Sequence, residues 1–246
     1  PDCGRVWWMP TGVLGALPLH AAASLTSGRT DLVSSTTTTL RALVDAQARP
    51  SVDITDARAV VVAISETPGR PLPRALEEAA AVAGLFEGRV HVLADGQATP
   101  RAVSSALADA GVAHFCCHAH ADLTDPASGA MSLTGGRLSV RDIAKLPQDG
   151  RVLAYLSTCT TMLTVGRLAD EGMHIASGFQ FAGFPTVIGT LWQIDDDVAH
   201  DVAESFYRSV RSDPDPAVAL HVAVRELRNR YPGRPALWSA FVHIGR

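Results

Sequence analysis

The sequence has few cysteines, one lysine (Lys145) and one asparagine (Asn229). Its four cysteines are Cys3, Cys116, Cys117 and Cys159, and none of them belongs to a CxxC pair. Adjacent Cys116 and Cys117 would point to opposite sides of a strand, where they are poorly placed to bridge each other. This usage favours a reducing compartment with thiols kept free, so we expect a cytoplasmic protein. The scarcity of lysine and asparagine suggests a high-GC bacterial genome rather than a function.

Long hydrophobic runs and a strong excess of one charge are also missing. The most apolar stretch, residues 176–194, is interrupted by Gln180, Gly183, Pro185 and Gly189, which suits a buried helix, turn and strand better than a membrane span. The N-terminus lacks the basic and apolar pattern of a signal peptide. With 21 basic and 25 acidic residues the formal charge is −4, which gives no electrostatic reason to expect nucleic acid as a partner.

Several motifs of catalysis and nucleotide binding are absent as well. The chain has no GxxxxGK[ST] loop, no GxGxxG after an expected strand, no GxSxG elbow and no HExxH pair. These absences argue against a P-loop enzyme, a dinucleotide-binding domain, an α/β-hydrolase and a zinc protease of the HExxH type. The 246 residues are 47% apolar and 19% charged, which is enough for one large domain or two small ones with a real core.

From residue 57 onward, expected strands alternate with expected helices. The run AVVVAI at residues 59–64 is typical of a strand that is buried on both faces. The helix expected over residues 73–86 would turn Leu76, Ala80, Ala83 and Leu85 or Phe86 toward the core. This rhythm predicts an α/β fold over residues 57–246, with a mostly parallel central sheet and helices on both faces. The other expected elements are strands at 90–93, 112–118, 152–156, 186–192 and 238–244, helices at 99–110, 170–182, 195–210 and 216–230, and a hairpin at 132–138 with a Gly-Gly turn.

Residues 1–50 have a weaker pattern. Two short apolar runs, 6–9 and 13–19, predict a small hairpin or edge unit, and the polar Ser/Thr tract at 34–39 precedes a short helix at 40–44. Residues 47–56 resemble a linker. We expect this segment and the α/β core to form one structural unit. The abrupt start also allows the chain to be a fragment of a longer sensor protein.

Two reactive side chains follow expected strands. His118 ends the strand at 112–118, and Cys159 follows the strand at 152–156, 41 residues later. Open α/β sheets place their sites at the carboxyl ends of strands, and adjacent strands lie about 4.8 Å apart. If the two strands are neighbours, His118 and Cys159 face each other across one crevice. Because a thiol needs a base nearby to become a nucleophile, the pair suggests a Cys-His dyad for acyl transfer.

Other roles for these residues remain open. His114, Cys116, His118 and His120 share one strand parity, so a metal site using Cys116, His118, His120 and Cys159 is an alternative. Zinc sites usually show two short ligand pairs, whereas this chain has a single cluster, so we expect no metal and no cofactor. His114, Cys116 and Cys117 are then expected to be core residues.

Four blocks of the sequence, in order, resemble the CHAT domains, which are caspase-like cysteine peptidases of clan CD related to separases. His114–Asp122 resembles their HFACHGxxD block, and Leu156–Thr161 resembles their LSACxT block. Further similar blocks are residues 7–20, which resemble the N-terminal segment, and residues 169–192, which resemble the block after the nucleophile. The resemblance implies a caspase-hemoglobinase-like fold. It also implies that Cys159 is the nucleophile and His118 the general base of a hydrolase that cleaves peptide bonds through an acyl-enzyme.

The resemblance also suggests how substrate would be held. By position, the backbone N–H groups of Ala119 and Cys159 would bind the oxyanion. Ala119 stands where the family usually has glycine, which is the best support for the alternative of a catalytically inactive, caspase-fold interaction module. The partners implied are a protein or peptide substrate, bound extended beside the sheet. An upstream sensor or repeat module, in a bacterial defence or cell-death pathway, is also implied, with neither nucleic acid nor membrane involved.

Four residues are candidates for the substrate pocket. Trp192, after an expected strand, would wall a subsite, and Asp196 would receive a basic P1 side chain, because a carboxylate at a pocket base selects Arg or Lys. Asp195 or Asp196 would equally well cap the helix that follows. Asp122 and Asp125 are further pocket candidates.

Overall fold

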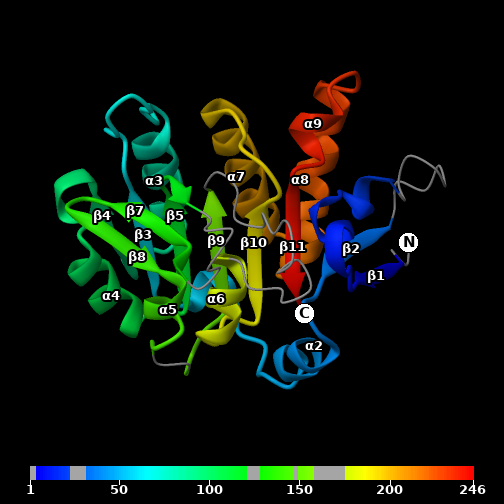
Figure 1. Cartoon of the computed structure of the whole chain (residues 1–246), viewed down its shortest axis with the longest axis horizontal. Coiled ribbons are helices and arrows are strands. Elements are labelled where there is room, and N and C mark those ends of the chain that lie inside the picture. Colours follow the sequence, from blue (N-terminus) through cyan, green and yellow to red (C-terminus); the bar gives the residue numbers. More distant parts are fainter. Residues whose placement is uncertain (1–3, 23–31, 121–127, 147–148, 158–174) are drawn as a thin grey trace.

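The computed structural model describes residues 4–22, 32–120, 128–146, 149–157 and 175–246. Its centre is an eight-stranded sheet with the order β1-β2-β11-β10-β9-β5-β3-β4 (Figure 1). The five strands from β10 to β4 are parallel, β11 runs antiparallel to β10, and β2 and β1 continue parallel to β11. The mostly parallel α/β sheet predicted from the sequence is confirmed. The strands are β1 Arg5–Trp8, β2 Val33–Thr36, β3 Ala59–Ala63, β4 Val90–Ala94, β5 Val112–Cys116, β9 Leu153–Ser157, β10 Thr186–Thr190 and β11 Phe241–Gly245.

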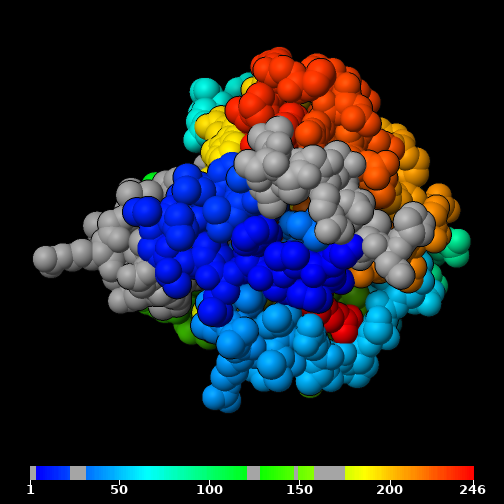
Figure 2. Space-filling model, turned by 90° about the vertical axis from the view of Figure 1, so that its right-hand side faces the viewer, coloured from blue at the N-terminus to red at the C-terminus, as the bar shows by residue number. Residues whose placement is uncertain are grey.

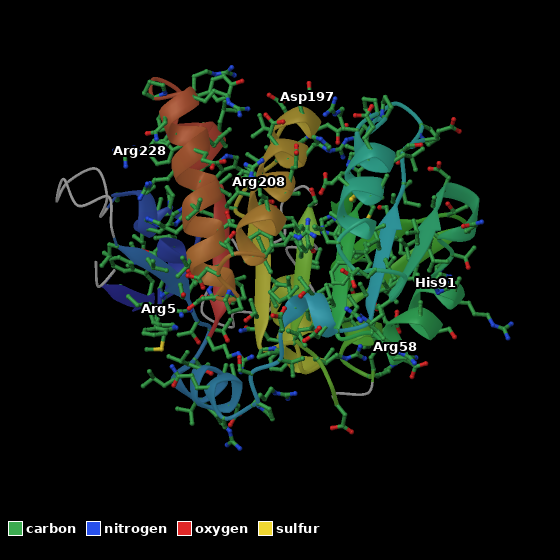
Figure 3. All side chains as sticks on the ribbon, turned by 180° about the vertical axis from the view of Figure 1, so that it is seen from behind. Arg5, Arg58, His91, Asp197, Arg208 and Arg228 are labelled. Atoms are coloured by element: carbon green, nitrogen blue, oxygen red, sulfur yellow. The ribbon has the colours of Figure 1, made fainter. Side chains whose placement is uncertain are left out.

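Two cores form because the central strands are buried on both faces. Every residue of β3, AVVVA, is buried, and its alternate side chains enter different cores. One core packs under α3 (Ala75–Ala83), α7 (Asp196–Val210) and α8 (Pro216–Arg230). The opposite core packs under α4 (Pro100–Ala108), α5 (Val140–Ile143) and α6 (Ile175–Phe181). Seen from behind, α7 and α8, which carry the labelled Arg208 and Arg228, lie in front of the sheet (Figure 3).

Helix starts follow their local capping signals. Thr99 caps α4 through its side chain, which accepts from the Ala102 N–H, and Pro100 occupies the first turn. Asp215 caps α8 in the same way, and Pro216 follows it, so the helix expected at 216–230 is confirmed with its bounds. Asp195 precedes α7, but its side chain makes no capping hydrogen bond. None of the described helices is long and apolar enough to cross a membrane.

A three-stranded sheet, β6-β7-β8, lies beside the carboxyl end of β5. Its strands are β6 Ala119–His120, β7 Ala130–Leu133 and β8 Gly136–Ser139, all antiparallel. The predicted hairpin is confirmed, but its two-residue turn is Thr134-Gly135, because Gly136 already belongs to β8. Gly135 has the positive φ of +76° that such a turn needs. The extra strand β6 begins directly after His118, so this small sheet fixes the chain where it leaves β5.

The expected N-terminal hairpin is wrong. β1 pairs in parallel with β2, 25 or more residues further along the chain, and residues 12–16 form a 3₁₀ helix, η1 (Gly12–Ala16), instead of a second strand. The Ser/Thr tract supplies β2, because the alternation there buries Val33 and Ser35 and leaves their neighbours half exposed. The edge position itself is as expected, since β1 is the last strand of the sheet. The short helix is confirmed as α2 (Leu40–Gln47), and Figure 2 looks onto this N-terminal end of the molecule.

Three expected elements differ in detail. α3 buries Ala75, Glu78, Ala79 and Val82 and leaves Leu76 and Ala80 exposed, so its predicted apolar side is wrong within the helix, although Phe86, just beyond its end, is buried as expected. The last strand begins at Phe241 rather than at residue 238, because Pro235 starts a short helix, α9 (Pro235–Trp238). A short 3₁₀ helix, η2 (Ile54–Asp56), lies in the expected linker.

Candidate active site

The carboxyl ends of β5 and β9 bring the two candidate segments together. β5 and β9 are parallel neighbours, and Cys116 lies opposite Ser157 in the register. The adjacency expected for the strands that carry His118 and Cys159 is therefore confirmed. His118 follows Cys116 by two residues, and Cys159 follows Ser157 by two. Cys159, Asp122 and Asp125 lie outside the described residues.

His118 is buried, and its ring is oriented by a backbone carbonyl. Its Nε2 atom lies 2.7 Å from the carbonyl oxygen of Arg70, in the loop between β3 and α3. A carbonyl oxygen only accepts hydrogen bonds, so Nε2 carries the proton. In the neutral ring Nδ1 then carries the lone pair and can accept a proton. The hydrogen bond to Arg70 thus fixes the Nε2–H tautomer of the neutral ring.

The loop that orients His118 is joined by hydrogen bonds to the start of α7 and to the residues just before it. Asp196 Oδ2 accepts a hydrogen bond of 2.6 Å from the Arg74 N–H, and the Arg70 guanidinium donates to Gln193 Oε1 at 3.2 Å. The Arg74 side chain pairs with Glu77 on α3. Burial raises the pKa of Asp196, and the hydrogen bond from Arg74 opposes that shift. Asp196, expected to receive a substrate side chain or to cap the helix, here fastens the loop that holds His118.

Trp192 and Ala119 occupy positions on either side of these strand ends. Trp192 follows β10, packs against both cores, and donates through Nε1 to the Ala236 carbonyl at 2.9 Å. Ala119 begins β6 opposite Met131, and the chain there has no positive φ. An alanine adopts this extended backbone without strain. The methyl group in place of the family's glycine is therefore compatible with the local conformation.

A buried polar cluster beneath His118 was missed in the sequence. His114 Nε2 lies 2.9 Å from Glu78 Oε1 and 3.1 Å from Cys116 Sγ, while His114 Nδ1 lies 3.1 Å from Tyr207 Oη. All these groups belong to the core under α3 and α7. Burial, followed by the nearby Glu78 carboxylate, raises the pKa of Cys116 and of Tyr155. The pKa of Tyr207 is also raised, chiefly by burial and then by the nearby Cys116 and Glu78.

The cluster corrects the metal-site alternative. Among the described residues, the group of His, Cys and acidic side chains close enough to share an ion is Glu78, His114 and Cys116. The sequence alternative instead joined Cys116 to His118, His120 and Cys159, the last of which lies outside the described residues. His118 Nε2 instead donates to Arg70, and His120 is exposed on β6. Glu78 gave no signal, because it resembles an ordinary surface glutamate beside Glu77.

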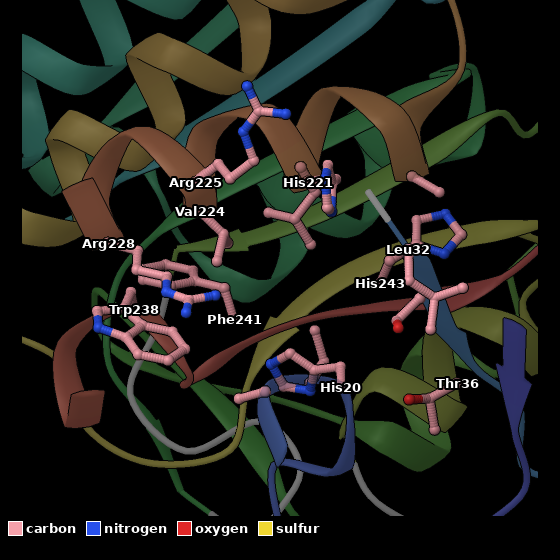
Figure 4. Close-up of a pocket in the computed structure, with 15 residues that line it drawn as sticks. His20, Leu32, Thr36, His221, Val224, Arg225, Arg228, Trp238, Phe241 and His243 are labelled. Atoms are coloured by element: carbon pink, nitrogen blue, oxygen red, sulfur yellow. The ribbon is translucent and has the colours of Figure 1, made fainter. Parts of the chain in front are cut away.

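A separate hollow lies at the other end of the sheet, between the N-terminal segment and α8. Its volume is about 70 Å³, and His20, His221, Arg225, Arg228, Trp238 and His243 are among its lining residues (Figure 4). Both ring nitrogens of His243 are buried without a hydrogen-bond partner. Burial, reinforced by Arg5, lowers the pKa of His243 to about 3, and burial lowers that of His20 to about 4. Both rings are therefore neutral near pH 7.

Solved structures with the same fold are cysteine proteinases and separases. Gingipain R (RgpB), an Arg-specific cysteine proteinase, aligns over 87% of this chain and 54% of its own, with a TM-score of 0.61 and 11% identity. A complex of Porphyromonas gingivalis RgpB pro- and mature domains matches similarly, over 87% of this chain and 55% of that one, with a TM-score of 0.61 and 11% identity. The Saccharomyces cerevisiae separase–securin complex aligns over 98% of this chain and 15% of its own, with a TM-score of 0.66 and 13% identity.

These matches define the fold as caspase-like, of the type found in cysteine peptidases. The model of the CHAT domain matches residues 1–246, and the chain belongs to the CHAT domain family. It spans about half of the gingipain chains and 15% of the separase chain. No curated protein matches it.

Proposed function

We propose that this chain is a cysteine endopeptidase in which Cys159 is the nucleophile and His118 the general base. The observation that carries the proposal is the orientation of His118, buried at the end of β5 with its Nε2 proton directed to the Arg70 carbonyl. With the proton on Nε2, Nδ1 is the ring nitrogen that we propose receives the proton of a thiol. Membership of the CHAT family and the adjacency of β5 and β9 support Cys159 as that thiol.

The proposed reaction has two steps. His118 Nδ1 takes the Cys159 proton, the thiolate attacks the carbonyl carbon of the peptide bond, and His118 returns the proton to the departing amine. Water then attacks the thioester, with His118 as base again, and releases the acid and the thiol. The N–H groups of Ala119 and Cys159 are proposed to hold the oxyanion in both steps. Loss of one such donor typically lowers the rate by about 10²–10³-fold.

Substrate is proposed to be a protein segment bound extended beside the sheet. Trp192 would wall a subsite, and Asp196, whose Oδ2 accepts from the Arg74 N–H, would attract an arginine or lysine at P1 through its carboxylate charge. Asp122 and Asp125 are further proposed contacts. The trigger is proposed to be a sensor or repeat module, in the same chain or a partner, within a bacterial defence or cell-death pathway.

Labelling with a peptidyl acyloxymethyl ketone that carries Arg at P1 tests the dyad. We expect stoichiometric modification of Cys159, identified by mass mapping, and a labelling rate that falls at least about 100-fold in His118→Ala. His120→Ala is the matched control, because His120 is exposed two residues further along the chain, and we expect its rate to match that of the wild type. Equal labelling of several cysteines, unchanged in His118→Ala, would contradict the proposal and favour the interaction module.

The same probe tests the P1 pocket. Asp196→Asn keeps an oxygen that can accept from the Arg74 N–H, so the loop beneath His118 should stay in place. We expect this change to slow labelling by the Arg probe about tenfold or more, while a probe with Ala at P1 is affected little. Asp197→Asn, which alters the exposed neighbour, is the control and should leave both rates unchanged. Equal slowing of both probes would assign Asp196 to the loop alone.

A further inference from the structure

The polar cluster under α3 and α7 brings a nitrogen, an oxygen and a sulfur donor to one point in the core. The three side chains come from two elements, Glu78 from α3 and His114 and Cys116 from β5, and are at most 2% exposed. We propose that they bind a divalent metal ion of the zinc class through Glu78 Oε1, His114 Nε2 and Cys116 Sγ. This metal site is distinct from the proposed Cys-His dyad, and binding of the ion does not depend on peptidase activity.

The distances between the donor atoms suit such an ion after a small expansion. The three atoms lie within 4.8 Å of one another, with His114 Nε2 at 2.9 Å from the carboxylate oxygen and 3.1 Å from the sulfur. Zinc binds nitrogen and oxygen at about 2.0–2.2 Å and sulfur at about 2.3 Å in a tetrahedron, so the donors would be about 3.3–3.7 Å apart. An opening of roughly half an ångström on each side of His114 Nε2, within the reach of side-chain torsions, brings these two distances to those of a coordination site.

Tyr207 supplies the support that a histidine ligand needs. A ligating histidine normally donates its second ring N–H to an acceptor, which fixes the tautomer and the ring orientation. His114 Nδ1 lies 3.1 Å from Tyr207 Oη, and the ring stacks on Tyr155 with centroids 4.8 Å apart. With the Nδ1 proton donated to the Tyr207 oxygen, the Nε2 lone pair points to Glu78 and Cys116, where the ion would lie.

The charge of the cluster also favours a cation. Buried carboxylates are paired with a positive group or coordinate a metal, because desolvation of an unpaired charge is costly. Within the described residues, the ion pair of Glu78 is with the His114 ring, and no arginine or lysine pairs with this carboxylate. A thiolate in the donor set selects zinc and similar metals over calcium and magnesium, which prefer oxygen ligands.

A hollow between α3 and α7 gives the ion a route from the surface. Its volume is about 210 Å³, and both Glu78 and Tyr207 line it. His200 and Glu204 of α7 line the same hollow, and the buried Nδ1 of His200 has no hydrogen-bond partner. The space is large enough for ordered water. Water in this hollow would complete the tetrahedron as the fourth ligand and bond to His200.

Cobalt binding tests the site in a chain without the proposed nucleophile. In the variant Cys3→Ser/Cys159→Ser, Cys116 and Cys117 are the remaining thiols. After treatment with chelator, we expect one equivalent of Co²⁺ to bind and to produce a thiolate-to-cobalt absorption band in the near ultraviolet. Further replacement Cys117→Ser should leave the band unchanged, whereas Cys116→Ser should abolish it. Zn²⁺ at about 100 times its dissociation constant should raise the melting temperature by about 5–10 °C.

Two results of the cobalt and zinc titrations would contradict a metal site at Glu78, His114 and Cys116. No stoichiometric cobalt or zinc in the Cys3→Ser/Cys159→Ser chain would overturn the proposal, as would a thiolate band that is lost with Cys117→Ser. Because Cys117→Ser leaves the proposed ligands intact, this comparison decides the question even if Cys116→Ser fails to fold. The chain used lacks Cys159, so a negative result leaves the peptidase proposal untouched, and inactivity of the wild type leaves the metal site untouched.

Discussion

The two faces of the central sheet are built from the same strands but differ in chemistry. β5 shows the difference most directly, since Phe115 and Cys117 enter the core under α4, α5 and α6, while His114 and Cys116 enter the core under α3 and α7. The first core is filled by aliphatic and aromatic packing, including Phe115 against Phe179. The second holds Glu78 and the hydroxyls of two tyrosines among its apolar side chains. One face therefore stabilises the fold through apolar packing, and the other adds buried polar groups that form hydrogen bonds with one another.

The largest effect is expected from a cavity in the apolar face. Phe115 is fully buried, and its ring lies edge-on to Phe179 with centroids 5.4 Å apart. Phe115→Ala should lower the free energy of unfolding by about 3–5 kcal/mol, because the transfer free energy is lost and a cavity remains. Urea unfolding measures the change. Phe181→Ala, on the exposed side of α6, is the control and should stay within about 0.5 kcal/mol. A loss below 1 kcal/mol at Phe115 would mean that this face repacks freely.

A smaller decrease in the free energy of unfolding is expected when the polar face loses Glu78. Glu78→Leu should cost about 3 kcal/mol, because it leaves His114 buried without its carboxylate partner. The double variant Glu78→Leu/His114→Leu should be more stable than the sum of the single changes predicts, with a coupling energy of about 1–3 kcal/mol. Urea unfolding in the presence of chelator gives all four corners of this cycle. Additive losses would show that the pair contributes no interaction of its own.

Acid should weaken the α8 side of the sheet through its neutral histidines. The pKa values of His243 and His20 lie at about 3 and about 4 in the folded chain, against an ordinary value of 6.5. Below about pH 6.5 the unfolded chain therefore binds protons that the folded chain excludes, and the free energy of unfolding decreases as pH falls. Between pH 7 and pH 5, His243 alone should account for about 2 kcal/mol.

Unfolding in urea at the two pH values measures this slope. His243→Leu should flatten it, whereas His91→Gln, on the exposed surface of β4, should leave it unchanged. An equal slope in the wild type and in His243→Leu would assign the acid sensitivity to other groups.

Local signals in the sequence were sufficient for the central strands and the longer helices after residue 57, but not for β6, α5 or α9. β-branched runs, and caps such as Thr99-Pro100 and Asp215-Pro216, act within a few residues and can be recognised without knowing the partner segment. The pairing of β1 with β2 could not be found in this way. It joins distant segments, and a Ser/Thr tract forms a strand there because burial of alternate side chains outweighs its turn preference.

The candidate site likewise contains some groups that local sequence signals reveal and others that they do not. His118 was identifiable because it is a reactive side chain at a strand end, but the carbonyl of Arg70 that orients it has no residue signature. Glu78 was hidden for a different reason. The expected apolar side of its helix contained Leu76, which is 42% exposed, so the helix is rotated from the expected orientation and buries a carboxylate. The partner of that carboxylate, His114 on β5, is distant in sequence and gives the helix no local signal.

The smallest expected effect is a gain in stability from the polar face. The Tyr155 hydroxyl is buried without a hydrogen-bond partner, next to the stacked His114 ring. A buried hydroxyl that has lost its water costs about 1–3 kcal/mol, so Tyr155→Phe should stabilise the chain by about 1 kcal/mol after the small cavity is counted. Phe115→Tyr, which adds a hydroxyl to the apolar face, is the matched opposite and should destabilise by about 1–3 kcal/mol. If Tyr155→Phe also destabilises, then its hydroxyl takes part in the polar cluster, through an ordered water, and the polar network extends from β5 to β9.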